Sequence, residues 1–167
     1  MASINGVSIK GLKTFRGHEG EICSQGNVYL DGKKLGFWSE NSWSGAGDYE
    51  FDEKLLKERC DMMAEGMKDG RVPIKEIMCA DILLYHLTIL MDYEKDFKKA
   101  VKRGTKAVVF TTNKHLISMY EFAYDDTDEN LIKACSELYP YTSVFRTLDD
   151  FNITIDKEHP MSGVLGE

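Results

Sequence analysis

Residues 26–38 read GNVYLDGKKLGFW, and this stretch decides the fold. It predicts a β-hairpin closed by a two-residue Asp31-Gly32 turn. Both central positions of such a turn need a positive φ, which Asp followed by Gly tolerates well. The turn predicts a register for the two strands, with the facing pairs Leu30 and Lys33, Val28 and Leu35, and Gly26 and Phe37.

The predicted register assigns the side chains of the hairpin to two faces, because successive residues of a strand point to opposite sides. One face carries Val28, Leu30, Leu35 and Phe37, and the other carries Tyr29, Lys34 and Trp38. We expect the first face to point into the core. Trp38 then points outward or into a second layer.

The rest of the first 51 residues also predicts β-structure. Val7 and Ile9 alternate with polar residues, and the alternation changes phase at Lys10-Gly11, which indicates a β-bulge. Residues 15–21 form a polar loop punctuated by glycine, and residues 39–48 form another that contains Trp43. Residues 49–51 can add a short strand.

The middle of the chain predicts helices. Asp52 is a candidate N-cap for a helix whose apolar stripe consists of Leu56, Cys60, Met63 and Met67 and which ends at Gly70. With Pro73 in its first turn, a second helix is expected over residues 74–103, and Gly104 follows its end. Within it Leu90, Tyr93, Phe97 and Val101 are expected to face inward and Glu94 outward, and a break near Asp92 stays open.

The last third mixes strand and helix signals. Residues 106–112 suit a central strand, residues 115–124 fit either a strand or a helix, and residues 141–155 can hold two short strands. Between them, an acidic turn at 125–129 precedes a helix expected over 131–138.

These signals predict an α+β fold, with an antiparallel N-terminal sheet packed against a helical layer and further short strands in the C-terminal third. The expected divisions are a hairpin module at 1–51, a helical and mixed remainder at 52–157 packed on it, and a loose tail at 158–167.

The charge and hydrophobicity of the chain indicate which classes of partner it favours. The 167 residues include 43% hydrophobic and 29% charged side chains, and the formal net charge is −7. An acidic chain repels nucleic-acid phosphates and anionic membranes and favours a protein partner with a basic surface. The most apolar run, residues 82–91, is interrupted by polar residues and is too short to cross a bilayer.

The cysteines and the N-terminus predict a reduced, cytoplasmic protein. Cys23, Cys60, Cys79 and Cys135 form no Cys-x-x-Cys pair, and residues 1–6 lack the features of a secretion signal. A disulfide framework is therefore not expected.

The sequence carries no motif that names a reaction, a metal or a cofactor. The loop at 16–21, with Arg16, His18 and Glu19, resembles catalytic loops most, but its glycines also suit an ordinary solvated turn. His86, inside an apolar helix, is expected to be bonded to a backbone carbonyl. His115 follows the strand at 106–112 and is a further candidate.

Aromatic residues are dense between positions 37 and 51. Trp38, Trp43 and Tyr49 lie amid Ser, Asn and Gly, which is typical of an anchor for a partner or ligand. The alternative is that the two tryptophans close a small satellite core. The candidate binding residues are therefore Arg16, His18, Glu19, Trp38, Trp43 and Tyr49.

Three segments carry a resemblance to known proteins: KTFRGHEG at 13–20, QGNVYLDGKKLG at 25–36 and NSWSG at 41–45. Together they resemble the N-terminal module of small uncharacterised proteins carried by bacteriophages and bacterial mobile elements. The resemblance implies a viral or mobile-element accessory protein acting in the cytoplasm of a bacterial host cell. It implies no catalytic residue.

Three hypotheses of function remain open at this stage. The first is a non-enzymatic inhibitor that binds a host or bacterial defence protein. The second is an oligomer of this chain that sequesters a small signal molecule in a pocket between hairpin and helix. The third is a small hydrolase that uses His18 or His115 with a carboxylate.

Overall fold

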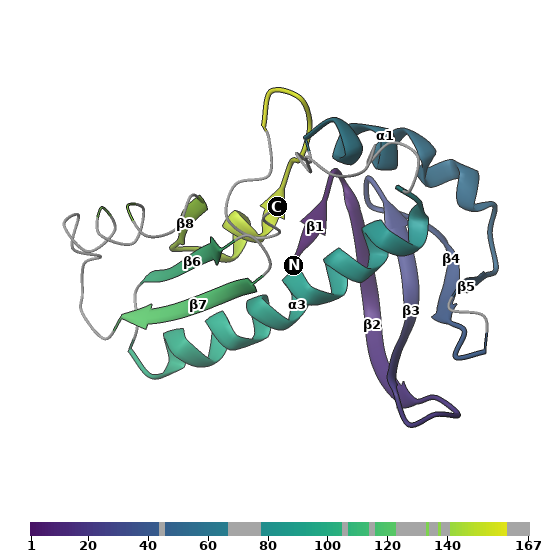
Figure 1. The fold of residues 1–167 in the computed structure, drawn as a ribbon, viewed down its shortest axis with the longest axis horizontal. Coiled ribbons are helices and arrows are strands. Elements are labelled where there is room, and N and C mark those ends of the chain that lie inside the picture. The colour runs from purple at the N-terminus through teal and green to yellow at the C-terminus, as the bar shows by residue number, and fades with distance from the viewer. Residues whose placement is uncertain are drawn as a thin grey trace.

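The computed structural model of the chain shows an α+β fold, as the sequence predicts (Figure 1). The structure describes residues 1–43, 46–66, 78–104, 107–113, 116–122, 133, 137 and 141–159. Within these ranges the chain forms a six-stranded mixed sheet, a three-stranded antiparallel sheet and two α-helices. The longer helix, α3, runs along both sheets in Figure 1.

The larger sheet has the strand order β5-β4-β3-β2-β1-β9. Its strands are β1 (Ser3–Ile4), β2 (Val7–Arg16), β3 (Ile22–Leu30), β4 (Lys33–Glu40), β5 (Gly47–Tyr49) and β9 (Asn152–Ile153). Neighbouring strands are antiparallel, except that β9 runs parallel to β1. The predicted N-terminal antiparallel sheet is thus confirmed, and the C-terminal third adds one strand to its edge.

The predicted start of the first helical segment at Asp52 is confirmed. Asp52 caps a 3-10 helix, η1 (Glu53–Leu56), by accepting a 3.0 Å hydrogen bond from the backbone N–H of Lys54, and η1 continues into α1 (Lys57–Gly66). The predicted apolar stripe is buried at Leu56, Cys60 and Met63. Met67, Gly70 and Pro73 lie outside the described residues.

The second helix begins later than predicted and has no break. Cys79 is its N-cap with an extended backbone, and α3 spans Ala80–Lys102 without interruption at Asp92. Residues 74–77 lie outside the described part of the chain. Gly104, with φ +100°, follows the end of the helix as predicted. No Gly or Pro interrupts α3, and its length lets it contact β1 and β2 at one end and β6 of the smaller sheet at the other.

Glu94 is buried, which corrects its predicted outward position. Its side chain is 5% exposed, and its Oε1 lies 3.2 Å from both the Met1 amino group and Nζ of Lys98. Burial alone would raise the pKa of Glu94, but these two cations and the backbone N–H of Ala2 lower it below its usual range. Conversely, Val101 is 47% exposed although it was expected to face inward.

The smaller sheet has β6 (Ala107–Asn113) between β7 (Leu116–Phe122) and β8 (Tyr141–Phe145). The predicted central strand at 106–112 is thereby confirmed, and the ambiguous stretch at 115–124 forms a strand. A 3-10 helix, η2 (Leu148–Phe151), connects β8 to β9, so the last predicted region does hold two short strands. The acidic turn at 125–129 and most of the helix expected at 131–138 lie outside the described residues.

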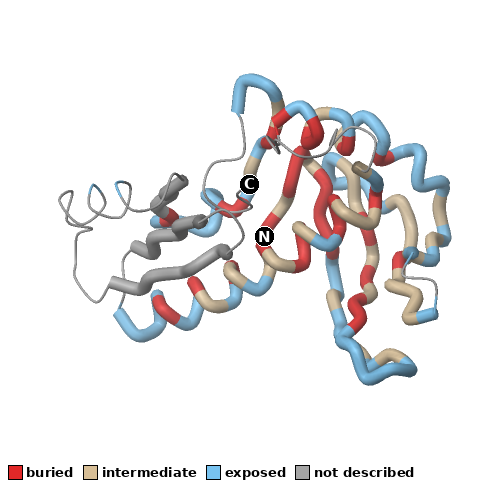
Figure 2. The backbone as a smooth tube through the Cα atoms, viewed as in Figure 1, coloured by how far each residue is buried: buried red, intermediate tan, exposed pale blue. Residues whose placement is uncertain are grey.

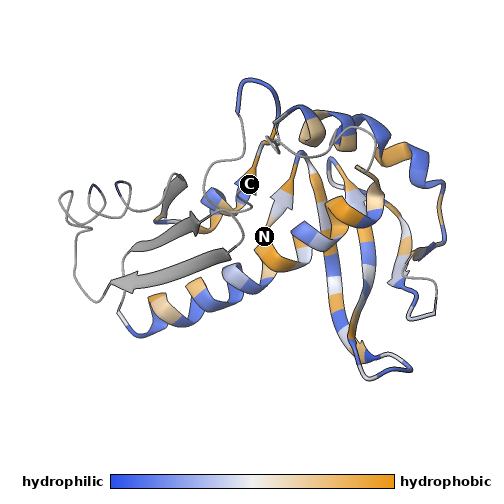
Figure 3. Ribbon diagram, in the orientation of Figure 1, coloured by the Kyte–Doolittle hydropathy of each residue, from blue (hydrophilic) through white to orange (hydrophobic). Residues whose placement is uncertain are grey.

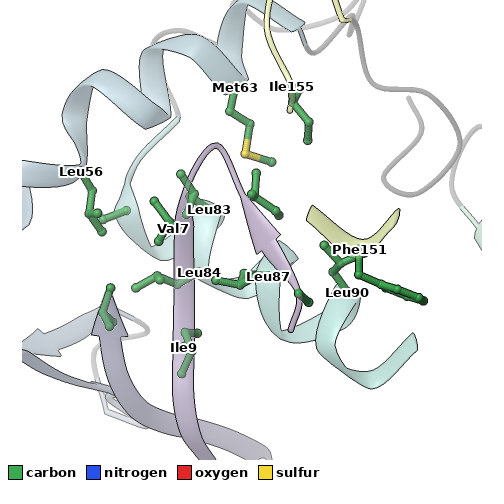
Figure 4. Packing of buried hydrophobic residues seen from close by; sticks show 14 of the residues in the cluster. Val7, Ile9, Leu56, Met63, Leu83, Leu84, Leu87, Leu90, Phe151 and Ile155 are labelled. Atoms are coloured by element: carbon green, nitrogen blue, oxygen red, sulfur yellow. The ribbon is translucent and has the colours of Figure 1, made fainter. Parts of the chain in front are cut away.

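One hydrophobic cluster joins the larger sheet, both helices and the segment after β8 (Figure 4). Its fully buried members include Val7, Ile9, Leu56, Met63, Leu83, Leu84, Leu87, Leu90 and Phe151. Burying one such side chain contributes about 1.5–3 kcal/mol. Along α3, hydrophobic and hydrophilic residues alternate, as expected for a helix with one buried face (Figure 3).

Two similar turns join the first four strands. Asp31 and Gly32 have φ values of +48° and +80°, which confirms the predicted turn. Asn5 and Gly6, at +50° and +78°, form a second such turn between β1 and β2 that we did not predict. Gly11, with φ +67°, lies where the pairing of β2 with β3 shifts by one residue, and this confirms the predicted bulge.

The register of β3 and β4 corrects the predicted faces of the hairpin. The pairing shifts after Tyr29 and Lys34, so that Val28 faces Gly36 and Leu35 is an extra residue in β4. Beyond this bulge every side chain of β4 changes face. Trp38 therefore faces the core and is 1% exposed, instead of pointing outward.

No described helix is both long and apolar enough to cross a membrane.

Candidate functional site

Two connecting loops lie side by side where the strands of the larger sheet end. Residues 17–21 connect β2 to β3, and residues 41–46 connect β4 to β5. A β-carbon at Gly17 would lie 2.6 Å from Cβ of Ser42, so the two loops touch there and leave no room for a side chain. We call these loops together the paired tips. The end of the β2–β3 arm is exposed over most of its surface (Figure 2).

The paired tips are joined by an aromatic stack. The ring centroids of His18 and Trp43 are 3.8 Å apart and their planes differ by 9°. Trp43 nevertheless remains 80% exposed, so most of its indole faces solvent. Its backbone N–H donates a 2.9 Å hydrogen bond to Oδ1 of Asn41, whose side-chain amide donates to Asp48 at 3.0 Å. The exposed indole is therefore held in place at both its ring and its backbone.

The charges around the stack are mainly acidic. Nε2 of His18 lies 3.6 Å from Oε1 of Glu19, and its Nδ1 lies 4.0 Å from Oε1 of Glu21. Both distances exceed hydrogen-bond length. A catalytic histidine needs a partner that orients its ring, and neither carboxylate does so here. Arg16 ends β2 beside these groups and is exposed.

The six predicted binding residues fall into two groups. Arg16, His18, Glu19 and Trp43 meet at the paired tips, as described above. Trp38 and Tyr49 do not join them, because they face each other across β4 and β5 further into the sheet. Trp38 belongs to the hydrophobic core, so its predicted role as an exposed anchor is wrong.

Sequence reasoning did not identify most of the residues that line a pocket between β4, β5 and the first turns of α3. The pocket has a volume of about 230 Å³ and is lined by Trp38, Glu40, Gly47, Asp81, Ile82 and Tyr85. We call it the β5–α3 pocket. Oδ1 of Asp81 accepts hydrogen bonds from the backbone N–H of Gly47 at 2.9 Å and from the hydroxyl of Tyr49 at 2.5 Å. Burial and this bond to Asp81 raise the pKa of the Tyr49 hydroxyl, so the phenol stays protonated.

A second hollow lies between η1, α1 and the start of α3. It measures about 300 Å³, and its lining includes Lys57, Cys60 and Cys79. Burial raises the pKa of the Cys60 thiol to about 12, so this thiol stays protonated and is a poor nucleophile. Cys23, Cys60 and Cys79 are free, while Cys135 lies outside the described residues.

The candidates for catalysis find little support in the described part of the chain. No group of three or more His, Cys, Asp or Glu side chains there could hold a metal ion. His86 is partly buried, and its buried Nδ1 has no hydrogen-bond partner among the described residues, so this nitrogen does not make the expected bond to a backbone carbonyl. His115 falls between β6 and β7, outside the described residues.

No family model matches the chain, and neither a curated protein nor a solved structure matches it.

Proposed function

We propose that this chain is a non-enzymatic protein-binding protein and that the paired tips are its recognition surface. The observation that carries the proposal is Trp43, a tryptophan that is 80% exposed and yet fixed by a ring stack and a backbone hydrogen bond. A large aromatic side chain held in one conformation loses little entropy on binding, which is why such residues often dominate interface energies.

The charge at the paired tips indicates the kind of partner. Glu19, Glu21 and Asp48 surround the stack, and the whole chain carries a formal net charge of −7. A basic surface complements these carboxylates and is attracted at long range. Ile22, which is 66% exposed at the start of β3, adds an apolar contact beside them.

The biological setting of the proposal rests on the resemblance of residues 13–45 to bacteriophage and mobile-element proteins. We place the protein in the cytoplasm of a bacterial host cell, where the partner is a host or defence protein and binding inhibits it. The hydrolase hypothesis is less favoured, since His18 lacks a hydrogen-bonded carboxylate.

Replacement of Trp43 by alanine tests the proposal. The chain is tagged, used to isolate its partner from a bacterial host, and the identified partner is then titrated against purified variants. We expect Trp43→Ala to weaken binding about a hundredfold, as for a central interface tryptophan, with an unchanged melting temperature because the side chain supports no core contact.

The matched control is Leu55→Ala, which removes another exposed apolar side chain, 52% exposed on η1. This variant should bind the partner as the unaltered chain does. Undiminished binding by Trp43→Ala would rule out the paired tips as the recognition surface.

A further inference from the structure

The β5–α3 pocket brings together groups that are far apart in the sequence. Glu40 ends β4, Gly47 begins β5, and Asp81 and Tyr85 lie in the first turns of α3. The pocket is separate from the paired tips, although both involve the β4–β5 connection. One of the three sequence hypotheses, an oligomer that sequesters a small molecule, also put a pocket between hairpin and helix, without naming the residues that line it.

Two carboxylates in this pocket have no cationic partner in the part of the chain that the structure describes. Neither Asp81 nor Glu40 makes an ion pair with any described residue. Oδ2 of Asp81 also accepts no hydrogen bond from a described residue. The other oxygen of Asp81 is fixed by Gly47 and Tyr49, and Oε2 of Glu40 accepts from the backbone N–H of Ser24. Two immobilised negative charges that line one hollow favour a cation.

The indole N–H of Trp38 is a second, independent sign of a ligand. Nε1 is buried and donates to no acceptor among the described residues, although Trp38 lines the pocket. Leaving a buried donor unpaired costs about 1–3 kcal/mol. Nε1 would lie 2.6 Å from a β-carbon at Gly47, the residue whose N–H is bonded to Asp81. The indole nitrogen therefore points to the same side of Gly47 as the carboxylate.

The remaining walls suit an organic cation better than a metal ion. Tyr85, which is 54% exposed, lines the pocket, and Ile82 adds an apolar wall. Cations bind favourably over aromatic faces. Ca²⁺ takes about 6–8 oxygen ligands, more than the two carboxylates of this pocket supply.

We propose that the β5–α3 pocket binds an organic cation of the guanidinium or ammonium type whose oxygen acceptor, a few bonds away, meets the indole N–H of Trp38. The cationic group lies between Asp81 and Glu40 and stacks against Tyr85. Such a group can belong to a free small molecule or to an arginine or lysine side chain of a protein.

Indole signals in ¹H–¹⁵N NMR spectra give a direct test, because the chain has two tryptophans. The probe is Nα-acetyl-arginine N-methylamide, and the matched probe is the citrulline analogue, in which a neutral urea replaces the guanidinium. We expect the arginine probe to shift the Trp38 indole signal downfield and leave the Trp43 signal in place, with binding about tenfold tighter than for the citrulline probe. Agmatine, titrated in parallel, carries the guanidinium group without a carbonyl oxygen. Binding as tight as that of the arginine probe indicates a free small cation as the ligand, and weaker binding indicates an arginine residue of a protein.

Asp81→Asn keeps an oxygen for Gly47 and Tyr49 but removes the charge, and it should weaken binding of the arginine probe about tenfold. Asp92→Asn is the same substitution on the exposed face of α3 and should leave binding unchanged. The proposal is overturned if the Trp38 signal does not move with up to about 20 mM arginine probe. It is equally overturned if both probes bind alike or if Asp81→Asn binds the arginine probe as tightly as the unaltered chain.

Discussion

At the scale of single residues, His86 has the clearest energetic consequence. It lies in α3 with Nδ1 buried and unbonded, and its ring meets that of Tyr85 edge-on at 5.7 Å between centroids. Burial disfavours the charged imidazolium and lowers the pKa of His86 to about 4. The histidine is therefore neutral in the folded protein throughout the physiological pH range.

This shift predicts that the protein loses stability in mild acid. An unfolded histidine has a pKa of about 6.5, so the unfolded state binds a proton first as the pH falls. The contribution of the neutral His86 to stability is fully present above pH 6.5 and decreases as the pH falls toward the folded pKa of about 4. We expect the free energy of unfolding to fall by about 2 kcal/mol between pH 7 and pH 5 through this group, measured by urea unfolding.

The His86→Leu variant isolates the contribution of this residue, because it leaves every other titrating group in place. Its free energy of unfolding should change less over the same interval, and the difference between the two proteins is the effect of His86. Most carboxylates titrate below this interval, so they add little to either curve. Parallel curves for the two proteins would contradict the assignment.

At the scale of elements, the hairpin of β3 and β4 shows how one residue redirects a strand. Its turn follows from Asp31-Gly32, but the bulge at Leu35 leaves no comparable mark in the sequence. A β-carbon at Gly36, next to the bulge, would lie 3.1 Å from the carbonyl oxygen of Glu50, so the strand passes close to the segment after β5. Burial of the large indole of Trp38 outweighs the loss of regular pairing at this point.

Deletion of Leu35 tests this account of the bulge. Without Leu35, Lys34 still pairs with Tyr29 and Gly36 with Val28, so Phe37 and Trp38 should keep their partners and their faces in an uninterrupted ladder. We expect unfolding free energy to fall by only about 1–2 kcal/mol, because the partly buried Leu35 side chain loses its contact with the core. Tryptophan emission should keep its maximum when measured in a Trp43→Phe background, where Trp38 alone emits.

An emission maximum shifted to the red of that of the Trp43→Phe parent would show that the deletion moves Trp38 out of the core. In that case Leu35 would not be the extra residue at the bulge. Leu35→Ala in the same background is the control, since it keeps the backbone count and should leave the emission maximum in place.

At the scale of the whole molecule, local signals predicted elements better than they predicted sites. Turn glycines, caps and alternation located the hairpin, the bulge at Gly11, the cap at Asp52 and the central strand β6. The Asn5-Gly6 turn was also readable, because Asn followed by Gly is a strong hairpin signal. The burial of Glu94 could not be predicted from the sequence, because it depends on β1 placing the Met1 amino group beside α3.

The two candidate sites also differ in how far the sequence alone predicts them. The paired tips are loops rich in polar residues next to a tryptophan, and their composition alone suggested a surface. The β5–α3 pocket depends on contacts between residues 38–49 and 81–85, which no local pattern connects. Of its lining residues only Trp38 was among the predicted binding residues, and Asp81 was not, because the groups that it contacts, Gly47 and Tyr49, come from another element.

A buried side chain, that of Asn5, adds to the pairing of β1 with β9 in joining the beginning and the end of the described chain. The amide of Asn5 accepts from the backbone N–H of Ile155 at 2.7 Å and donates to its carbonyl oxygen at 2.9 Å. It also donates to the carbonyl oxygen of Arg59 in α1 at 3.3 Å. Asn5 therefore ties the first turn both to α1 and to the segment that follows β9.

Asn5→Gly tests this link without adding backbone strain, because glycine accepts the positive φ of +50° found at this position. The variant leaves the N–H and C=O of Ile155 buried and unpaired, and we expect unfolding free energy to fall by about 2–4 kcal/mol. Asp31→Gly is the matched control, because Asp31 occupies the same place in the equivalent turn with a φ of +48°. Its side chain makes an exposed ion pair to Arg59 at 2.9 Å, and such pairs contribute about 0–1 kcal/mol. Equal destabilisation of the two variants in urea unfolding would show that the turn itself, rather than the amide of Asn5, joins the ends of the molecule.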